Sequence, residues 1–62
     1  MDADFIRLLT RHLERSRRVY SGMLDHERMQ PGSDQLRIAA LEDALDDIEM
    51  ILDRLGKIGT NE

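Results

Sequence analysis

Two histidines, His12 and His26, are the side chains of this chain best suited to metal binding or acid–base chemistry. They lie fourteen residues apart, so on one helix they share a face but are separated by about 21 Å of helix rise. Two ligands at that separation cannot hold one ion. The sequence has no cysteine and no Glu-x-x-His of the kind that di-iron bundles use. We therefore expect no metal site and no cofactor.

Serine is the other residue type that could carry catalysis. Ser16 lies one helical turn after His12, but no acidic side chain is placed to orient that histidine, as a catalytic triad requires. Ser21 has no base at helical spacing. The glycine-containing loop Pro31-Gly32-Ser33 is much shorter than a phosphate-binding loop. The sequence predicts that the protein is not an enzyme and has no catalytic residues.

Acidic side chains recur at three- and four-residue steps in the second half of the chain, at Glu42, Asp46, Glu49 and Asp53. On a helix they form one stripe, which could attract Mg²⁺ or Ca²⁺ only weakly because it lacks a loop to wrap the ion with oxygens. We interpret the stripe as a solvated helix face. A docking surface for a basic partner is the alternative.

The first half of the chain carries the opposite charge. Candidates for contact with nucleic acid are Arg7, Arg11, Arg15 and Arg18, since a guanidinium group can bind a phosphate with two hydrogen bonds. The favoured interpretation is that basic and acidic charges flank the contact line of two antiparallel helices and specify their pairing. Arg15 and Arg18 would then meet the region of Asp43, Asp46 and Asp47, and Arg11 would approach Glu49 or Asp53.

The elements that carry these side chains follow from apolar residues spaced three and four apart on both sides of one Pro–Gly turn. The pattern predicts helices over about residues 3–28 and 34–55, a turn at 29–33 and a frayed tail at 59–62. The expected N-caps are Asp2 or Asp4 for the first helix and Ser33 for the second. Gly56 is expected to end the second helix in a left-handed conformation. The fold class is an all-α antiparallel two-helix hairpin, a single domain over residues 1–62.

Two helices side by side have one contact line and no enclosed interior, so part of each apolar stripe stays in water. We therefore expect a second hairpin, most simply another copy of the chain, to complete a homodimeric four-helix bundle with coiled-coil-like packing. A different protein is the alternative occupant. Leu45 and Leu52 lie beside the line of Leu41, Ile48 and Leu55, so they are expected to face the next chain. The expected interface residues are Phe5, Leu9, Leu13, Tyr20, Leu41, Leu45, Ile48 and Leu52.

The charge and hydropathy pattern narrows the class of protein further. The 62-residue chain has a net charge of −4, with 40% hydrophobic residues, and no apolar run approaches the roughly 20 residues that span a bilayer. Its first residues are acidic, unlike a signal peptide, so a cytoplasmic location without membrane contact is expected.

By elimination, the sequence predicts a small non-catalytic protein–protein interaction module. A regulator, adaptor or co-chaperone of a bacterium or phage is the type expected. The alternative is an RNA-binding helical hairpin that uses the arginine-rich face. In layout and length the chain resembles the plasmid copy-number regulator Rop, a hairpin that dimerises and binds RNA through one helix face. No shared motif allows residues to be carried over.

Overall fold

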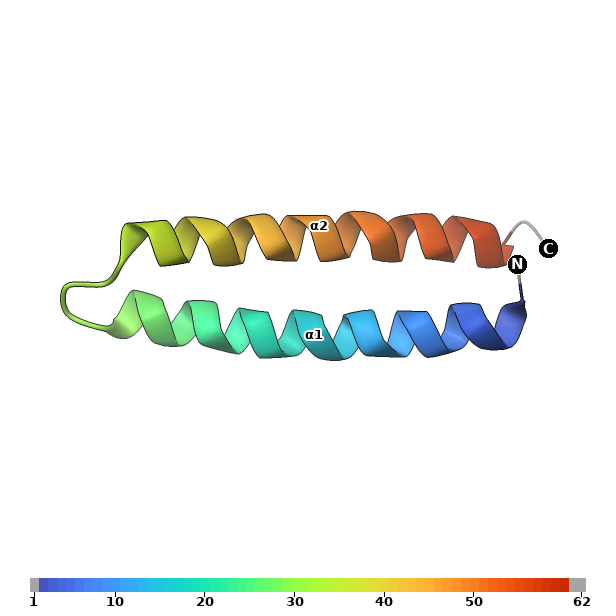
Figure 1. The fold of residues 1–62 in the computed structure, drawn as a ribbon, viewed down its shortest axis with the longest axis horizontal. Coiled ribbons are helices and arrows are strands. Elements are labelled where there is room, and N and C mark those ends of the chain that lie inside the picture. The colour runs from blue at the N-terminus through green and yellow to red at the C-terminus, as the bar shows by residue number, and fades with distance from the viewer. Residues whose placement is uncertain (1, 61–62) are drawn as a thin grey trace.

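The chain folds as two long helices that run back along each other. The computed structural model describes residues 2–60, with side chains over 2–58, and within them it contains helix α1 (Ala3–Met29), helix α2 (Gln35–Thr60) and no strand. The start of α1 and the end of α2 lie together, opposite the loop (Figure 1). The predicted antiparallel two-helix hairpin is confirmed.

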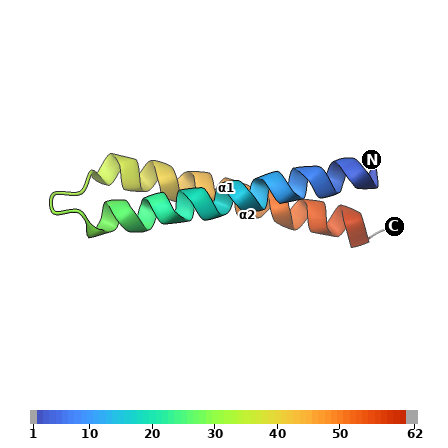
Figure 2. The same ribbon diagram turned by 90° about the horizontal axis from the view of Figure 1, so that it is seen from below.

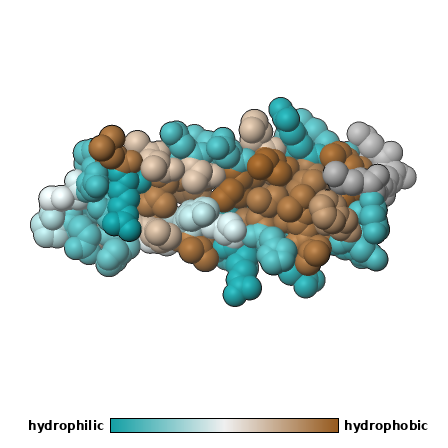
Figure 3. All heavy atoms as spheres, viewed as in Figure 1, coloured by the Kyte–Doolittle hydropathy of each residue, from teal (hydrophilic) through white to brown (hydrophobic). Residues whose placement is uncertain are grey.

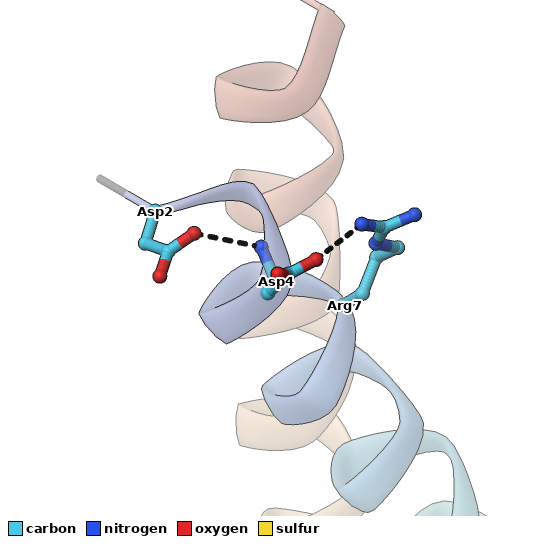
Figure 4. A network of polar contacts seen from close by, with 3 residues as sticks. All are labelled: Asp2, Asp4 and Arg7. Atoms are coloured by element: carbon cyan, nitrogen blue, oxygen red, sulfur yellow. Dashed lines mark hydrogen bonds and ion pairs between the residues drawn. The ribbon is translucent and has the colours of Figure 1, made fainter.

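Helix α1 begins where the side chain of Asp2 accepts a hydrogen bond from a backbone N–H group that has no partner within the helix. Asp2 has extended backbone angles, and its carboxylate accepts a hydrogen bond from the backbone N–H of Asp4 at 3.0 Å. Its carbonyl accepts a bond from the N–H of Ile6 at 3.0 Å. The carboxylate of Asp4 in turn pairs with Arg7 (Figure 4). Of the two predicted caps, Asp2 is the N-cap.

The loop reverses the chain through one proline and one glycine. Gln30 precedes Pro31 and has extended angles, φ −79° and ψ 133°, as a residue before proline prefers. Gly32 has φ +72°, a left-handed conformation that glycine adopts without steric penalty. The loop covers residues 30–34, one residue later than the predicted turn at 29–33, because α1 ends at Met29 instead of residue 28 and α2 begins at Gln35.

Helix α2 is capped one residue later than predicted. The carboxylate of Asp34 accepts hydrogen bonds from the N–H groups of Leu36 at 3.0 Å and Arg37 at 3.3 Å. The N–H of Asp34 itself donates to the carboxylate of Glu27, at 3.0 Å, from the end of α1. The prediction of Ser33 as the cap is wrong, because the side chain that accepts from the first N–H groups of α2 is that of Asp34.

The end of α2 also differs from the prediction. The helix continues through Gly56 to Thr60, and Gly56 does not have a positive φ, so the expected left-handed cap and helix end at residue 55 are wrong. A glycine costs only about 1 kcal/mol in a helix interior, and the apolar stripe continues past it. Of the predicted frayed tail, residues 59–60 belong to α2, and residues 61–62 lie outside the described residues.

One line of buried apolar side chains holds the hairpin together. We call this contact line the seam; its buried members are Ile6, Leu24, Leu41, Ile48 and Leu55. Leu41, Ile48 and Leu55 are seven residues apart, the spacing that makes helices wrap gently around each other. Figure 2 shows the resulting crossing of the two helices near their middles. Each seam residue retains 6–8% exposure, as expected when no second layer covers the seam.

Candidate functional site

An apolar surface lies beside the seam of the hairpin. On α2, the residues three positions after the buried line are Ala44, Ile51 and Ile58. On α1, Leu9 and Met23 have the same relation to Ile6 and Tyr20. A three-residue step rotates the side chain by about 60° from the seam. Because the helices are right-handed and antiparallel, both rotations lead to the same face of the hairpin.

We call this surface the open face. Its apolar members are Phe5, Leu9, Val19 and Met23 of α1 with Ala44, Ile51 and Ile58 of α2, and the polar residues Ser16 and Asp47 lie among them near the middle. Phe5 and Val19 are 50% and 54% exposed, and Ile51 and Ile58 are each 39% exposed. Figure 3 shows apolar residues gathered over both helices in the half of this face away from the loop. Exposed apolar area shared by two helices is typical of a protein-binding surface.

The opposite face of the hairpin is apolar mainly on α2. Residues four positions after the seam line are Leu45 and Leu52 on α2, both half-buried, and Thr10, Arg17 and the buried Leu24 on α1. Leu45 and Leu52, expected to face a second chain, therefore lie on the side where α1 is mainly polar. A partner helix packed there would contact Arg17 at its centre.

The structure distributes the predicted interface residues over three environments. Leu41 and Ile48 are buried in the hairpin's own seam. Leu9, Leu13, Tyr20, Leu45 and Leu52 are half-buried, and Phe5 is exposed. The exposed members Val19, Met23, Ile51 and Ile58 were missing from the prediction. The available signal was the seven-residue spacing of Ala44, Ile51 and Ile58 on α2; on α1, Leu9 and Met23 are fourteen residues apart with Ser16 between them.

The loop end of the open face is hollow. A shallow depression of about 430 Å³ is lined by Gly22, Met23, His26, Glu27 and Arg37. Gly22 helps to create it, since a Cβ built at this position meets no atom within 4 Å. His26 lies beside Gln30, with 3.3 Å between the two Nε2 atoms. Glu27 and Arg37 make the lining charged, and the depression is open to solvent. It therefore forms the polar end of the open face, next to the loop.

Across the part of the chain that the structure describes, one arginine of α1 forms an ion pair with an acidic residue of α2, and this pair lies near the loop. Arg28 donates from Nη2 to Oε2 of Glu42 at 3.0 Å, joining the two helices. Within the described residues, Arg11, Arg15 and Arg18 form no ion pair. The predicted pairing of these arginines with Asp43, Asp46, Asp47, Glu49 and Asp53 is therefore wrong. An exposed pair contributes only about 0–1 kcal/mol against lost side-chain freedom, too little to bring side chains together.

The residues considered for metal chemistry are spread over the surface. His12 and His26 are exposed, and no group of three His, Asp or Glu side chains within residues 2–60 is arranged to hold a metal ion. The acidic stripe on α2 is exposed at Glu42, Asp46 and Glu49, while Asp53 pairs with Lys57 at 3.1 Å. The stripe is therefore exposed along the hairpin, and both the solvated-face interpretation and the docking-surface alternative stay predictions.

No protein-family model, curated protein or solved structure matches this chain. Over the part that the structure describes, neither helix is apolar enough along its length to cross a membrane. The open face and the exposed arginines are therefore the features from which function has to be inferred.

Proposed function

We propose that this protein is a small non-catalytic module that binds another protein chain through its open face. The observation that carries the proposal is the exposure of Phe5, Val19, Ile51 and Ile58 on one side of the hairpin. Covering each 100 Å² of such surface contributes about 2.5 kcal/mol before the costs of association. A role as a regulator, adaptor or co-chaperone fits a protein whose chemistry is confined to binding.

The energetics of the hairpin support the same conclusion. Among the described residues, its seam buries five apolar side chains, and each of them retains 6–8% exposure. A chain this short leaves about 40% of its unfolded surface exposed, so a partner that covers the open face would supply the second layer that the hairpin lacks. Binding and stability are then coupled, because any molecule that binds only the folded hairpin also stabilises it.

A capture experiment with matched variants tests the proposal. The wild-type chain, Ile51→Glu and Ala39→Glu are immobilised, and the proteins retained from a lysate of the source organism, including the chain itself, are identified by mass spectrometry. Both variants add one negative charge to α2, but Ala39 is exposed and lies off the open face. We expect Ile51→Glu alone to lose the retained protein.

Circular dichroism must show both variants helical for the comparison to hold. Equal capture by the wild-type chain and by a folded Ile51→Glu chain would contradict the proposal. A folded Ile51→Gln variant offers the same comparison without the added charge, should the Glu variant unfold.

Nucleic-acid binding is the second candidate function, and one observation favours it. Arg11 and Arg18 lie seven residues apart on one side of α1, exposed and without an ion pair among the described residues. Together with Arg7 and Arg15 they could contact a phosphate backbone. A gel-shift titration against RNA and DNA at two salt concentrations tests this, because binding through phosphates weakens steeply with salt. The absence of any salt-sensitive shift would eliminate this candidate.

A further inference from the structure

We propose that the open face binds a second copy of this chain, with both loops at the same end of the resulting four-helix bundle. In this arrangement α1 of each copy packs on α2 of the other. The inference rests on the proposed function, since it names the partner of the same surface. Its arguments are the size of the face, the positions of the charges and the distribution of apolar residues along the hairpin.

The face is large enough for a stable dimer. The hairpin measures 48 Å along its helices and 14 Å across the open face, which gives roughly 1,300 Å² for two copies and lies within the usual range for specific interfaces. The two helices have nearly equal lengths, 27 and 26 residues, so two hairpins can cover each other from end to end.

Two symmetric arrangements bring open faces together. A two-fold axis parallel to the helices puts both loops at one end and places α1 beside the partner's α2. A two-fold axis across the helices puts the loops at opposite ends and places α1 beside the partner's α1. The side chains at the middle of each helix discriminate between these arrangements. In the second arrangement the two-fold axis passes near them, so each of them lies next to its own copy in the partner.

The charges favour loops at the same end. Arg15 lies near the middle of α1 and Asp47 near the middle of α2, and both are exposed. Asp47 precedes Ile48 as Phe5 precedes Ile6, so it lies on the open face. Arg15, two positions after Leu13, lies on the outer flank of α1. Because α1 ends at Met29 and α2 begins at Gln35, the two residues are at almost the same level. If both loops lie at the same end, Arg15 of one copy lies close to Asp47 of the other copy. With loops at opposite ends, each residue meets its own like-charged copy, which is unfavourable.

The apolar residues favour the same arrangement independently. The apolar part of the open face lies in the half away from the loop (Figure 3), and the loop half contains the polar depression around His26 and Arg37. If both loops lie at the same end, the apolar half of one open face packs on the apolar half of the other, and the two polar halves also lie together. The same arrangement brings Met29 of one copy to the level of Leu36 of the other copy. These two residues are 82% and 84% exposed in the single hairpin.

The arrangement can be measured with spin labels, because the chain has no cysteine of its own. Gln35→Cys places one label at the loop end of α2, away from the open face. Loops at the same end predict a label separation of roughly 20–30 Å, the width of a four-helix bundle. Loops at opposite ends predict a separation close to the 48 Å length of the hairpin. Asp46→Cys, near the middle of α2, is the control that gives a short distance in both arrangements.

Sedimentation of the full chain is measured on the same samples. A dimer mass with the short Gln35→Cys distance supports the proposal, and a dimer with the long distance overturns it while leaving the open face as an interaction surface. A monomer at tens of micromolar also overturns it. In that case, loss of another captured protein by Ile51→Glu would show that the open face binds a different chain, and the proposed function would survive.

Charge reversal gives a second readout of the same contact. Arg15→Asp and Asp47→Arg should each raise the dimer dissociation constant about fivefold or more at low salt, because each replaces two attractions in the dimer with repulsions. The double variant restores opposite charges and should return to within about twofold of wild type. A double variant that dimerises more weakly than both single variants would overturn the assignment of neighbours.

Discussion

Replacing Ile48 by alanine should remove a large share of the stability of this fold. Ile48 lies in the middle of the seam and is 7% exposed. The substitution deletes three methyl or methylene groups. At roughly 0.8 kcal/mol for each buried group, their removal lowers the free energy of unfolding by about 2.4 kcal/mol. The cavity left behind adds to the loss, although a seam open to solvent on both sides can partly collapse. We expect the free energy of unfolding to fall by about 2–3.5 kcal/mol.

That loss is large because the chain is short. A domain of this size has a total stability on the order of 3–9 kcal/mol, so Ile48→Ala should leave the helices only marginally stable. Urea denaturation followed by far-UV circular dichroism measures the effect as a shift of the midpoint. All variants are compared at one protein concentration, since association would make the midpoint depend on it.

The control substitution is Glu49→Ala, at the neighbouring position. Glu49 is exposed, and alanine has a helix propensity at least as good, so the expected change lies within about 0.5 kcal/mol. A loss below about 1 kcal/mol for Ile48→Ala would refute the assignment of Ile48 to the seam. An equal loss for both variants would show that the measurement reports helix propensity instead of packing.

Three further substitutions test local features of the hairpin. Gly56→Ala should raise the free energy of unfolding by up to about 1 kcal/mol in thermal melts, because Gly56 is inside α2 and an added Cβ meets no atom within 4 Å; a loss would indicate a left-handed glycine instead. Asp34→Ala should cost about 1 kcal/mol by removing the cap of α2, whereas Ser33→Ala should cost clearly less in the same urea titration. Arg28→Ala should cost at most about 1 kcal/mol, and the loss should shrink with added salt, since its pair with Glu42 is exposed; a loss unchanged in high salt would contradict an electrostatic role.

The sequence by itself determined the features that depend on neighbouring residues. Helix formation follows from apolar residues three and four apart, and the reversal follows from Pro31 and Gly32, which restrict the backbone wherever they occur. The line of Leu41, Ile48 and Leu55 was recognisable because residues seven apart return to the same side of a helix. These relations are complete within a few turns of helix, so they can be predicted without a partner element.

The tertiary structure alone decided how each helix is rotated about its axis against the other. That rotation puts Ile51 and Ile58 on the open face with Phe5, and it puts Leu45 and Leu52 on the opposite face. A wide apolar stripe is compatible with several rotations that differ by less than one residue step. The choice among them is made by simultaneous packing along the whole seam and by contacts between the helices, such as the hydrogen bond from Asp34 to Glu27. Because these contacts join residues from two elements, no pattern within either helix contains the information that selects them.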